Sequence, residues 1–215
     1  MIDTSINVCY KFYMKKEDRG KFIVDAALKV FSSKGYANTR MGDIAKEAGM
    51  SYGLVYHYFH NKEELFNVIV KEWWLSYYSE VERLRDSSLP VTEKITGIIQ
   101  YLLNICTAHP EKIFLFTTEV SRGFAYHSDV SSREDFVKLF SLVGEIIVEG
   151  QQKKIFRSDI KPRYLVYALM GGIDAVLSII AFGEEEISEI SKKRMIDNIA
   201  SLFFQGALAN KAEAS

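Results

Sequence analysis

The chain has 215 residues, of which 48% are hydrophobic and 26% are charged, and this balance predicts a soluble globular protein of one or two domains. The same figures exclude a disordered chain, while 13 glycines and 3 prolines exclude collagen-like and proline-rich chains. The formal net charge of −1 indicates no particular class of partner.

Residues 1–20 lack the apolar stretch of about 7–15 residues that a signal peptide needs. Cys9 and Cys106 are the only cysteines, too few for the disulfide framework of a small secreted protein. We therefore expect a cytoplasmic protein. Residues 1–14 come before the first periodic pattern and are expected to form a disordered arm, and Met14 is a second candidate start.

Apolar residues recur at helical spacing along nearly the whole chain, and alternation with a period of two is almost absent. The sequence therefore predicts an all-α protein of about nine helices. A basic residue and a glycine at Lys34-Gly35 end the first helix. The apolar stripe of this helix consists of Phe22, Ile23, Ala26, Ala27, Val30 and Phe31.

Two short helices and one long helix are predicted next. The first covers residues 39–48 and ends before Gly49, and the second covers residues 51–58. Asn61 caps a long helix that runs to about residue 85, because an acid follows three positions later as in a capping box. Three prolines divide the remainder into helices at 91–108, 111–122, 132–152, 162–182 and 188–209.

The predicted helix at 162–182 is apolar from Leu165 to Phe182, with Asp174 as the only charge. At about 1.5 Å per residue this run would nearly cross a membrane. However, Asp174 lies in its middle beside two glycines, and no basic cluster flanks the run. We therefore favour a helix that is buried on all sides, as at a subunit interface, over a membrane helix.

Residues 39–59 are the part of the sequence that is most informative about function. Two short helices joined by a tight turn at Gly49 have the layout of a helix-turn-helix. The free N–H groups where these helices begin, at Thr39 and Ser51, suit phosphate, and Gly53 leaves room for a DNA backbone. Hydroxyl and imidazole groups can bond to phosphate oxygens and contact thymine methyl groups. The outer face of the second helix carries such groups on Tyr52, Tyr56, His57 and Tyr58.

A dense set of residues between 19 and 66 follows a known pattern. It consists of Ala26-Ala27, Phe31, Lys34-Gly35-Tyr36, Thr39, Asp43-Ile44-Ala45, Ala48-Gly49, Ser51, Gly53, Tyr56, Tyr58-Phe59, Lys62-Glu63 and Leu65. With these residues the chain resembles the TetR family of bacterial transcription regulators. The resemblance implies a three-helix helix-turn-helix DNA-binding domain at residues 15–66. It also implies an effector-binding and dimerisation domain at 67–215, with dimer helices at 162–182 and 188–209.

The function that the resemblance implies is that of a ligand-responsive repressor. Such a protein binds a palindromic operator as a homodimer and leaves it when a small hydrophobic effector binds. Arg40 stands where threonine or serine is frequent, and Tyr52 stands where a basic residue is frequent. No catalytic activity, cofactor or metal is expected. The implied DNA contacts are Thr39, Arg40, Ser51, Tyr52, Gly53, Tyr56, His57 and Lys62, with Thr39, Arg40 and Lys62 on phosphates.

Side chains suited to an effector cavity lie in the second half of the chain. At helical spacing most aromatic residues belong to a core, so the set predicts the lining of a cavity rather than individual contacts. Asp174 suits a cationic or hydroxylated ligand, a polar contact at an interface, or its own symmetry mate. A lipid-like, acyl or aromatic effector fits the rest. The candidates are Trp74, Tyr78, Phe116, Phe124, Phe140, Tyr167, Met170 and Asp174.

Other functions stay open. A helical small-molecule binding protein with a vestigial DNA head would lack a steep salt dependence of DNA binding. Gly49-Met50-Ser51-Tyr52-Gly53 matches the nucleophile elbow of serine hydrolases, but that elbow needs a strand before the serine, and a helix is predicted there. Ser51 is better explained as a helix N-cap. The pairs His57–His60 and Cys106–His109 lack a third metal ligand nearby, and no glycine motif for a nucleotide cofactor occurs.

Overall fold

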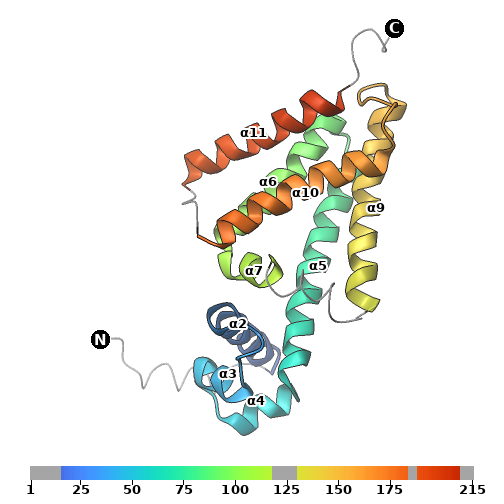
Figure 1. The fold of residues 1–215 in the computed structure, drawn as a ribbon. Helices are drawn as coiled ribbons and strands as arrows, with labels where there is room; N and C mark the ends of the chain where they lie inside the picture. The colour runs from blue at the N-terminus through green and yellow to red at the C-terminus, as the bar shows by residue number, and fades with distance from the viewer. Residues whose placement is uncertain (1–15, 118–129, 184–187, 209–215) are drawn as a thin grey trace. The chain divides into compact units, whose positions relative to one another are not determined.

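The computed structural model describes residues 16–117, 130–183 and 188–208, which form nine helices and one isolated β-bridge (Figure 1). The predicted all-α class is confirmed. The expected arm at residues 1–14 lies outside the described residues, as does Phe124. The helices are α2 (Lys16–Lys34), α3 (Met41–Ala48), α4 (Tyr52–Tyr58), α5 (Lys62–Asp86), α6 (Val91–Ala108), α7 (Pro110–Leu115), α9 (Val130–Gln152), α10 (Pro162–Ala181) and α11 (Glu189–Ala207).

Local sequence explains where these helices begin and end. Gly35 follows α2 with a φ of 77°, and Gly49 follows α3 with a φ of 59°, a left-handed conformation that glycine adopts without strain. At the start of α5, Asn61 Oδ1 accepts a hydrogen bond from the Glu64 N–H at 2.8 Å. The Glu64 carboxylate accepts one from the His60 N–H, also at 2.8 Å. The predicted capping pattern is therefore present, with the acid reaching one residue further back.

α3 and α7 are among the helices whose bounds differ from the predicted ones. α3 begins after Arg40, its N-cap, rather than at Thr39. The Thr39 hydroxyl donates a hydrogen bond to the Gly35 carbonyl at 2.8 Å, which holds Thr39 in the turn before the helix. α7 ends at Leu115, whereas the prediction ran from 111 to 122. The later part of that predicted range lies outside the described residues.

The chain forms two compact units, and it passes from the first to the second within α5, between Trp73 and Trp74. In the first unit, α2 packs against α3, and α3 packs against α4. Each short helix is therefore stabilised by packing, since a helix of this length is marginal alone in water. The core of the first unit includes Ile23, Ala27, Phe31, Ile44, Ala48, Val55 and Leu65, all fully buried.

In the second unit, α10 packs against α6, α7, α9 and α11. The end of α11 is attached to the turn that follows α9. Phe156 pairs with Leu208 in the isolated bridge, and the Arg157 N–H donates a hydrogen bond to the Ala207 carbonyl at 2.8 Å. The core of this unit includes Ile95, Ile98, Ile99, Leu103, Val143, Ile146, Ile147 and Ile173.

A buried ammonium group joins three helices of the second unit. Lys94 on α6 is 3% exposed, and its Nζ donates hydrogen bonds to the Arg85 carbonyl at 2.6 Å and to Glu149 Oε2 at 2.9 Å. A buried charge is costly unless it is paired, so these bonds hold the end of α5 and α9 against α6. Hydrogen bonds from Lys153 and Lys94 lower the pKa of Glu149. Arg85 also binds Glu145 on α9 at 3.1 Å.

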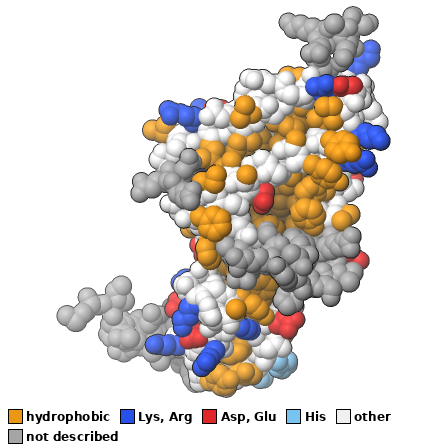
Figure 2. All heavy atoms as spheres, in the orientation of Figure 1, with side chains coloured by type: hydrophobic (Ala, Val, Ile, Leu, Met, Phe, Trp, Pro, Cys, Tyr) orange, Lys and Arg blue, Asp and Glu red, His pale blue; other side chains and the backbone are white. Residues whose placement is uncertain are grey.

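Within the single chain, α10 buries one face and exposes the other, and burial of the exposed face at a subunit interface stays a prediction. The helix lies at the surface of its unit, and its most apolar 18-residue window is only 33% buried. Among the described helices it is the one long and apolar enough to cross a membrane, judged by length and composition. Figure 2 shows hydrophobic side chains gathered over this face. The large exposed apolar residues of α10 and its C-cap are Tyr164, Tyr167, Ile179 and Phe182.

Candidate nucleic-acid interface

α4 presents a polar aromatic face at the surface of the first unit. Ser51 is its N-cap, because the Ser51 Oγ accepts a hydrogen bond from the Leu54 N–H at 3.3 Å. Val55 on the inner side is fully buried. The outer side chains therefore point away from the core, as the helical phase predicts. They belong to Tyr52, Tyr56 and His57, all exposed.

The phenol groups of Tyr52 and Tyr56 lie together on this face, with ring centroids 4.5 Å apart. A hydrogen bond to Tyr56 raises the pKa of Tyr52, so this phenol stays protonated at neutral pH and keeps its O–H donor. His57 meets the edge of the partly buried Tyr58 ring, with centroids 5.6 Å apart. The face therefore offers hydrogen-bond donors and apolar ring surface, the groups that reach base edges and phosphates.

Gly53 lies on the same exposed face. A Cβ atom at this position would meet nothing within 4 Å, so packing within the chain does not require glycine here. Glycine inside a helix costs roughly 0.5–1 kcal/mol relative to alanine. The cost of this glycine is therefore not offset by packing within the chain.

The start of α3 carries an exposed guanidinium group on Arg40. The Arg40 N–H donates a hydrogen bond to Asp43 Oδ2 at 3.0 Å, and Lys34 Nζ lies 2.6 Å from Asp43 Oδ1. The hydrogen bond from Lys34 holds the pKa of Asp43 below its ordinary value. Asp43 therefore fixes the backbone of Arg40 while the Arg40 side chain stays at the surface. A phosphate contact from that side chain remains a prediction.

Thr39 and Lys62 have partners within the protein. Thr39 is 2% exposed, and its hydroxyl bonds to the backbone. Lys62 Nζ donates hydrogen bonds to the carbonyl oxygens of Tyr36 at 2.7 Å and of Ala37 and Thr39 at 3.1 Å each. In this structure both side chains serve the fold, and their predicted phosphate contacts have no support from its geometry.

The predicted effector residues fall into separate groups in the second unit. Trp74 stacks on Tyr78 with ring centroids 5.9 Å apart and meets the Phe116 ring edge-on at 5.3 Å. The Tyr78 hydroxyl donates a hydrogen bond to Asp135 at 2.8 Å. Trp74 is 1% exposed, so within the described residues this group is part of a core.

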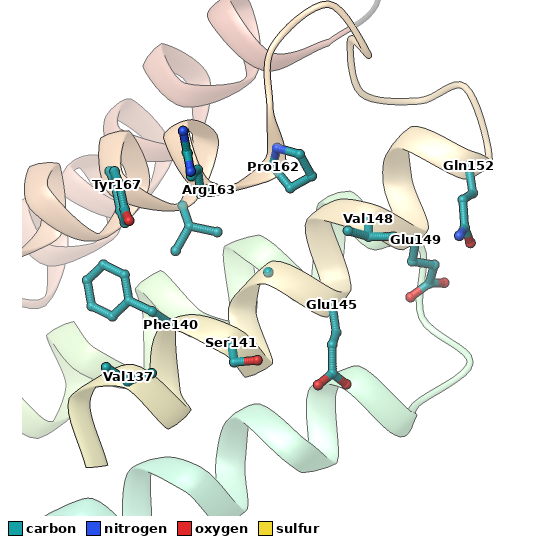
Figure 3. Close-up of a pocket in the computed structure, with 12 residues that line it drawn as sticks. Val137, Phe140, Ser141, Glu145, Val148, Glu149, Gln152, Pro162, Arg163 and Tyr167 are labelled. Carbon is teal, nitrogen blue, oxygen red and sulfur yellow. The ribbon is translucent and has the colours of Figure 1, made fainter. Parts of the chain in front are cut away.

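Phe140 and Tyr167 line a groove of about 570 Å³ between α9 and the start of α10 (Figure 3). Their ring centroids lie 5.9 Å apart, and the ring planes are tilted by 50°. Glu145 belongs to the lining, but its carboxylate points away from α10 and binds Arg85 at 3.1 Å. The groove is therefore mainly apolar along its centre. Further apolar lining comes from Val137, Val148, Pro162 and Val166.

Met170 and Asp174 lie further along α10. The Met170 Sδ accepts a hydrogen bond from the buried Tyr77 hydroxyl at 3.9 Å. Desolvation raises the pKa of the exposed Asp174 carboxyl group. Burial raises the pKa of Cys106 to about 11, so that thiol is protonated and unreactive at neutral pH. No three His, Cys, Asp or Glu side chains in the described part of the chain are grouped to hold a metal ion.

Comparison with known proteins matches residues 23–69 to the model described as bacterial regulatory proteins, tetR family. This range contains the whole of α3 and α4. The HTH-type transcriptional repressor NicS of Pseudomonas putida is 27% identical over 64% of this chain and 66% of its own length. The chain thus matches just under two thirds of that relative.

Two solved structures share the fold over most of the chain. FadR from Bacillus subtilis, in complex with stearoyl-CoA, has a TM-score of 0.72 at 20% identity, over 86% of this chain and 98% of that one. AibR, in complex with isovaleryl coenzyme A and operator DNA, has a TM-score of 0.72 at 16% identity, over 87% of this chain and 99% of that one. At such identities the likeness establishes the fold.

Proposed function

The chain belongs to the TetR family of bacterial regulatory proteins, and on this premise we propose that it is a transcriptional repressor. It binds a palindromic operator as a homodimer and is released by a small hydrophobic effector. The observation that carries the proposal is the outer face of α4, where exposed hydroxyls and an imidazole surround Gly53. The N-cap bond of Ser51 explains that serine without a nucleophilic role.

The two proposed domains follow one another along the chain and have different functions. Residues 15–66 bind DNA, and residues 67–215 bind the effector and the second subunit. The exposed apolar face of α10 supports a two-fold interface made by α10 and α11, because a face of this kind is favourable only when covered. A regulator of this type acts on DNA in the cytoplasm.

Replacing Tyr56 and His57 by alanine should each lower operator affinity about tenfold or more, since each lost base contact costs about 1–3 kcal/mol. The operator is first selected from a random DNA pool at about physiological salt, and binding is then measured by fluorescence anisotropy. Asn67→Ala, an exposed change on α5, is the matched control and should bind like the parent. Unchanged affinity in both α4 variants would contradict the assignment of α4 as the recognition helix.

The salt dependence of the same measurement addresses the rival function. A repressor that neutralises several phosphates loses affinity steeply as salt rises, because bound counterions are released on binding. A helical binding protein with a vestigial DNA head would select no sequence and would bind DNA weakly at all salt concentrations.

For the effector we propose an acyl compound whose apolar chain lies in the groove between α9 and α10. The mainly apolar lining around Phe140 and Tyr167 supports this choice. FadR and AibR, which share the fold, were solved with acyl-CoA ligands. The protein has one conformation that binds the operator and one that does not. The effector releases DNA only if its affinity is higher for the conformation that does not bind the operator.

Phe140→Ala should raise the stearoyl-CoA concentration needed to release the operator at least fivefold, because it removes one wall of the groove. Operator affinity should not change. Phe136→Ala is the control, since Phe136 lies beside Phe140 on α9 with ring centroids 4.2 Å apart but outside the groove lining. Anisotropy of labelled operator reports both quantities. Equal effects of the two variants would place the effector elsewhere.

A further inference from the structure

We propose that Lys62 is a positioning residue that fastens the two ends of the helix-turn-helix together and does not bind a DNA phosphate. The proposal rests on the DNA-binding function proposed above. We call Lys62 and the three carbonyl groups of Tyr36, Ala37 and Thr39 the Lys62 clamp.

The hydrogen bonds of the clamp use every donor of the ammonium group. A lysine ammonium has three N–H donors and no acceptor. Lys62 Nζ lies 2.7 Å from the Tyr36 oxygen, 3.1 Å from the Ala37 oxygen and 3.1 Å from the Thr39 oxygen. It also lies 4.5 Å from the centroid of the Tyr36 ring, a cation–π contact. A phosphate could bind this ammonium only by displacing a backbone partner.

The Lys62 clamp joins the two ends of the helix-turn-helix. Thr39 directly precedes the start of α3, and Lys62 is the first residue of α5, just after α4. The segment between them contains the entire helix-turn-helix. One side chain therefore joins the backbone that enters this motif to the helix that leaves it.

An aromatic contact reinforces the same joint. Phe66, one turn further along α5, packs against Tyr36 with ring centroids 4.9 Å apart. Phe31 of α2 contacts both rings, with its centroid 5.4 Å from that of Tyr36 and 6.1 Å from that of Phe66. The start of α5 thus holds the turn between α2 and α3 by both polar and apolar contacts.

The clamp matters for binding because the exposed Arg40 follows Thr39 directly. Phosphate contacts set the register and orientation of a protein on the duplex, so the backbone beneath them has to be fixed. Without the clamp, the start of α3 would lose its polar link to α5. It would keep the Thr39–Gly35, Arg40–Asp43 and Lys34–Asp43 interactions and the ring contacts of Tyr36. Operator affinity should then fall although no DNA contact has been removed.

Salt dependence separates this role from a phosphate contact. Each neutralised phosphate adds about 0.9 to the slope of log affinity against log salt. We expect Lys62→Met to lower operator affinity at least tenfold at every salt concentration, with a slope unchanged from the parent. Arg40→Met, the matched control at an exposed cation, should reduce the slope by about 0.9.

Two outcomes would overturn the proposal. A Lys62→Met slope reduced as much as that of Arg40→Met would make Lys62 a phosphate ligand, and an unchanged affinity would make the clamp irrelevant to binding. Lys62→Arg serves if the methionine variant does not fold. It keeps the charge, but a planar guanidinium cannot aim three donors from one nitrogen at three carbonyl oxygens. Parent-like affinity in Lys62→Arg would therefore also overturn the proposal.

A measurement without DNA keeps this test independent of the proposed function. Amide hydrogen exchange at residues 36–43 should be at least tenfold faster in the free Lys62→Met protein than in the free parent, with exchange in α9 unchanged. Equal exchange at residues 36–43 would mean that the clamp fixes nothing. If the parent selects no operator, the repressor proposal fails, whereas the exchange result still decides the structural role of Lys62.

Discussion

Replacing Gly53 by alanine should remove most of the operator affinity while making the free protein more stable. The added methyl group meets no atom of the chain within 4 Å, so it strains nothing in the free state. Alanine is favoured over glycine inside a helix by roughly 0.5–1 kcal/mol, and the free energy of unfolding should rise by about that amount. A methyl group between α4 and the DNA backbone should lower affinity about 100-fold, or about 2.7 kcal/mol.

Urea denaturation and operator titration measure these two opposite effects on the same preparation. Gly144→Ala on α9 is the control, because its added Cβ would make an ordinary contact with Val166 Cγ2 at 3.9 Å. It should keep full operator affinity. If Gly53→Ala binds the operator as the parent does, the backbone of α4 does not approach DNA closely, and the glycine has no explanation at the interface.

Replacing Gly150 by alanine should destabilise the protein by about 3 kcal/mol, because it overpacks a closed part of the core. The new methyl group would overlap the Phe156 ring. That ring is 1% exposed and is held by Phe203 and Phe204, with centroids 6.3 and 6.4 Å away, so it has no room to move aside. The thermal midpoint should fall by about 6–12 °C, at about 2–4 °C per kcal/mol for a protein of this size.

Gly144→Ala again serves as the control, since it adds the same methyl group to the same helix without an overlap. A second change identifies the cause. Phe156→Leu makes room for the methyl group. The double variant should therefore be destabilised by less than the sum of the two single variants. Strictly additive effects, or a Gly150→Ala protein as stable as the parent, would show that the overlap is relieved in some other way.

The helices and their ends could be predicted because the signals for them are local. Gly35 and Gly49 adopt the left-handed conformation at the positions where a helix-ending pattern occurs. Ser51 and Asn61 accept the hydrogen bonds expected of N-caps, from N–H groups three residues ahead. Each of these interactions joins residues within one turn of chain, so the sequence alone carries the information.

The outward face of α4 could also be predicted, since a single helical phase separates Val55 from Tyr52 and His57. The hydrogen bonds that Thr39 and Lys62 make within the protein could not be predicted. Lys62 binds carbonyl groups 23 to 26 positions earlier in the chain, and backbone carbonyls have no sequence signature. A lysine near a helix-turn-helix has the same appearance in the sequence whether its partner is a phosphate or the protein itself.

The effector residues show a second limit of the same kind. Aromatic residues at helical spacing are equally typical of a core and of a cavity, and the structure separates them. Trp74 is in a packed core, whereas Phe140 and Tyr167 border a groove. That separation depends on how α9 and α10 pack, which periodicity within either helix does not specify. Asp174, predicted as a special site, lies at the surface of the single chain.

In the proposed homodimer, the apolar face of α10 and α11 makes the stability of this protein depend on its concentration. When two copies cover that face, the free energy of unfolding gains a mass-action contribution that grows with the logarithm of subunit concentration. A newly made, solitary chain lacks that contribution and offers its apolar surface to unspecific association. In the proposed homodimer, the concentration of subunits in the cell therefore also determines how stable each subunit is. The large apolar side chains concerned are Tyr164, Tyr167, Ile179, Phe182, Ile190 and Leu202.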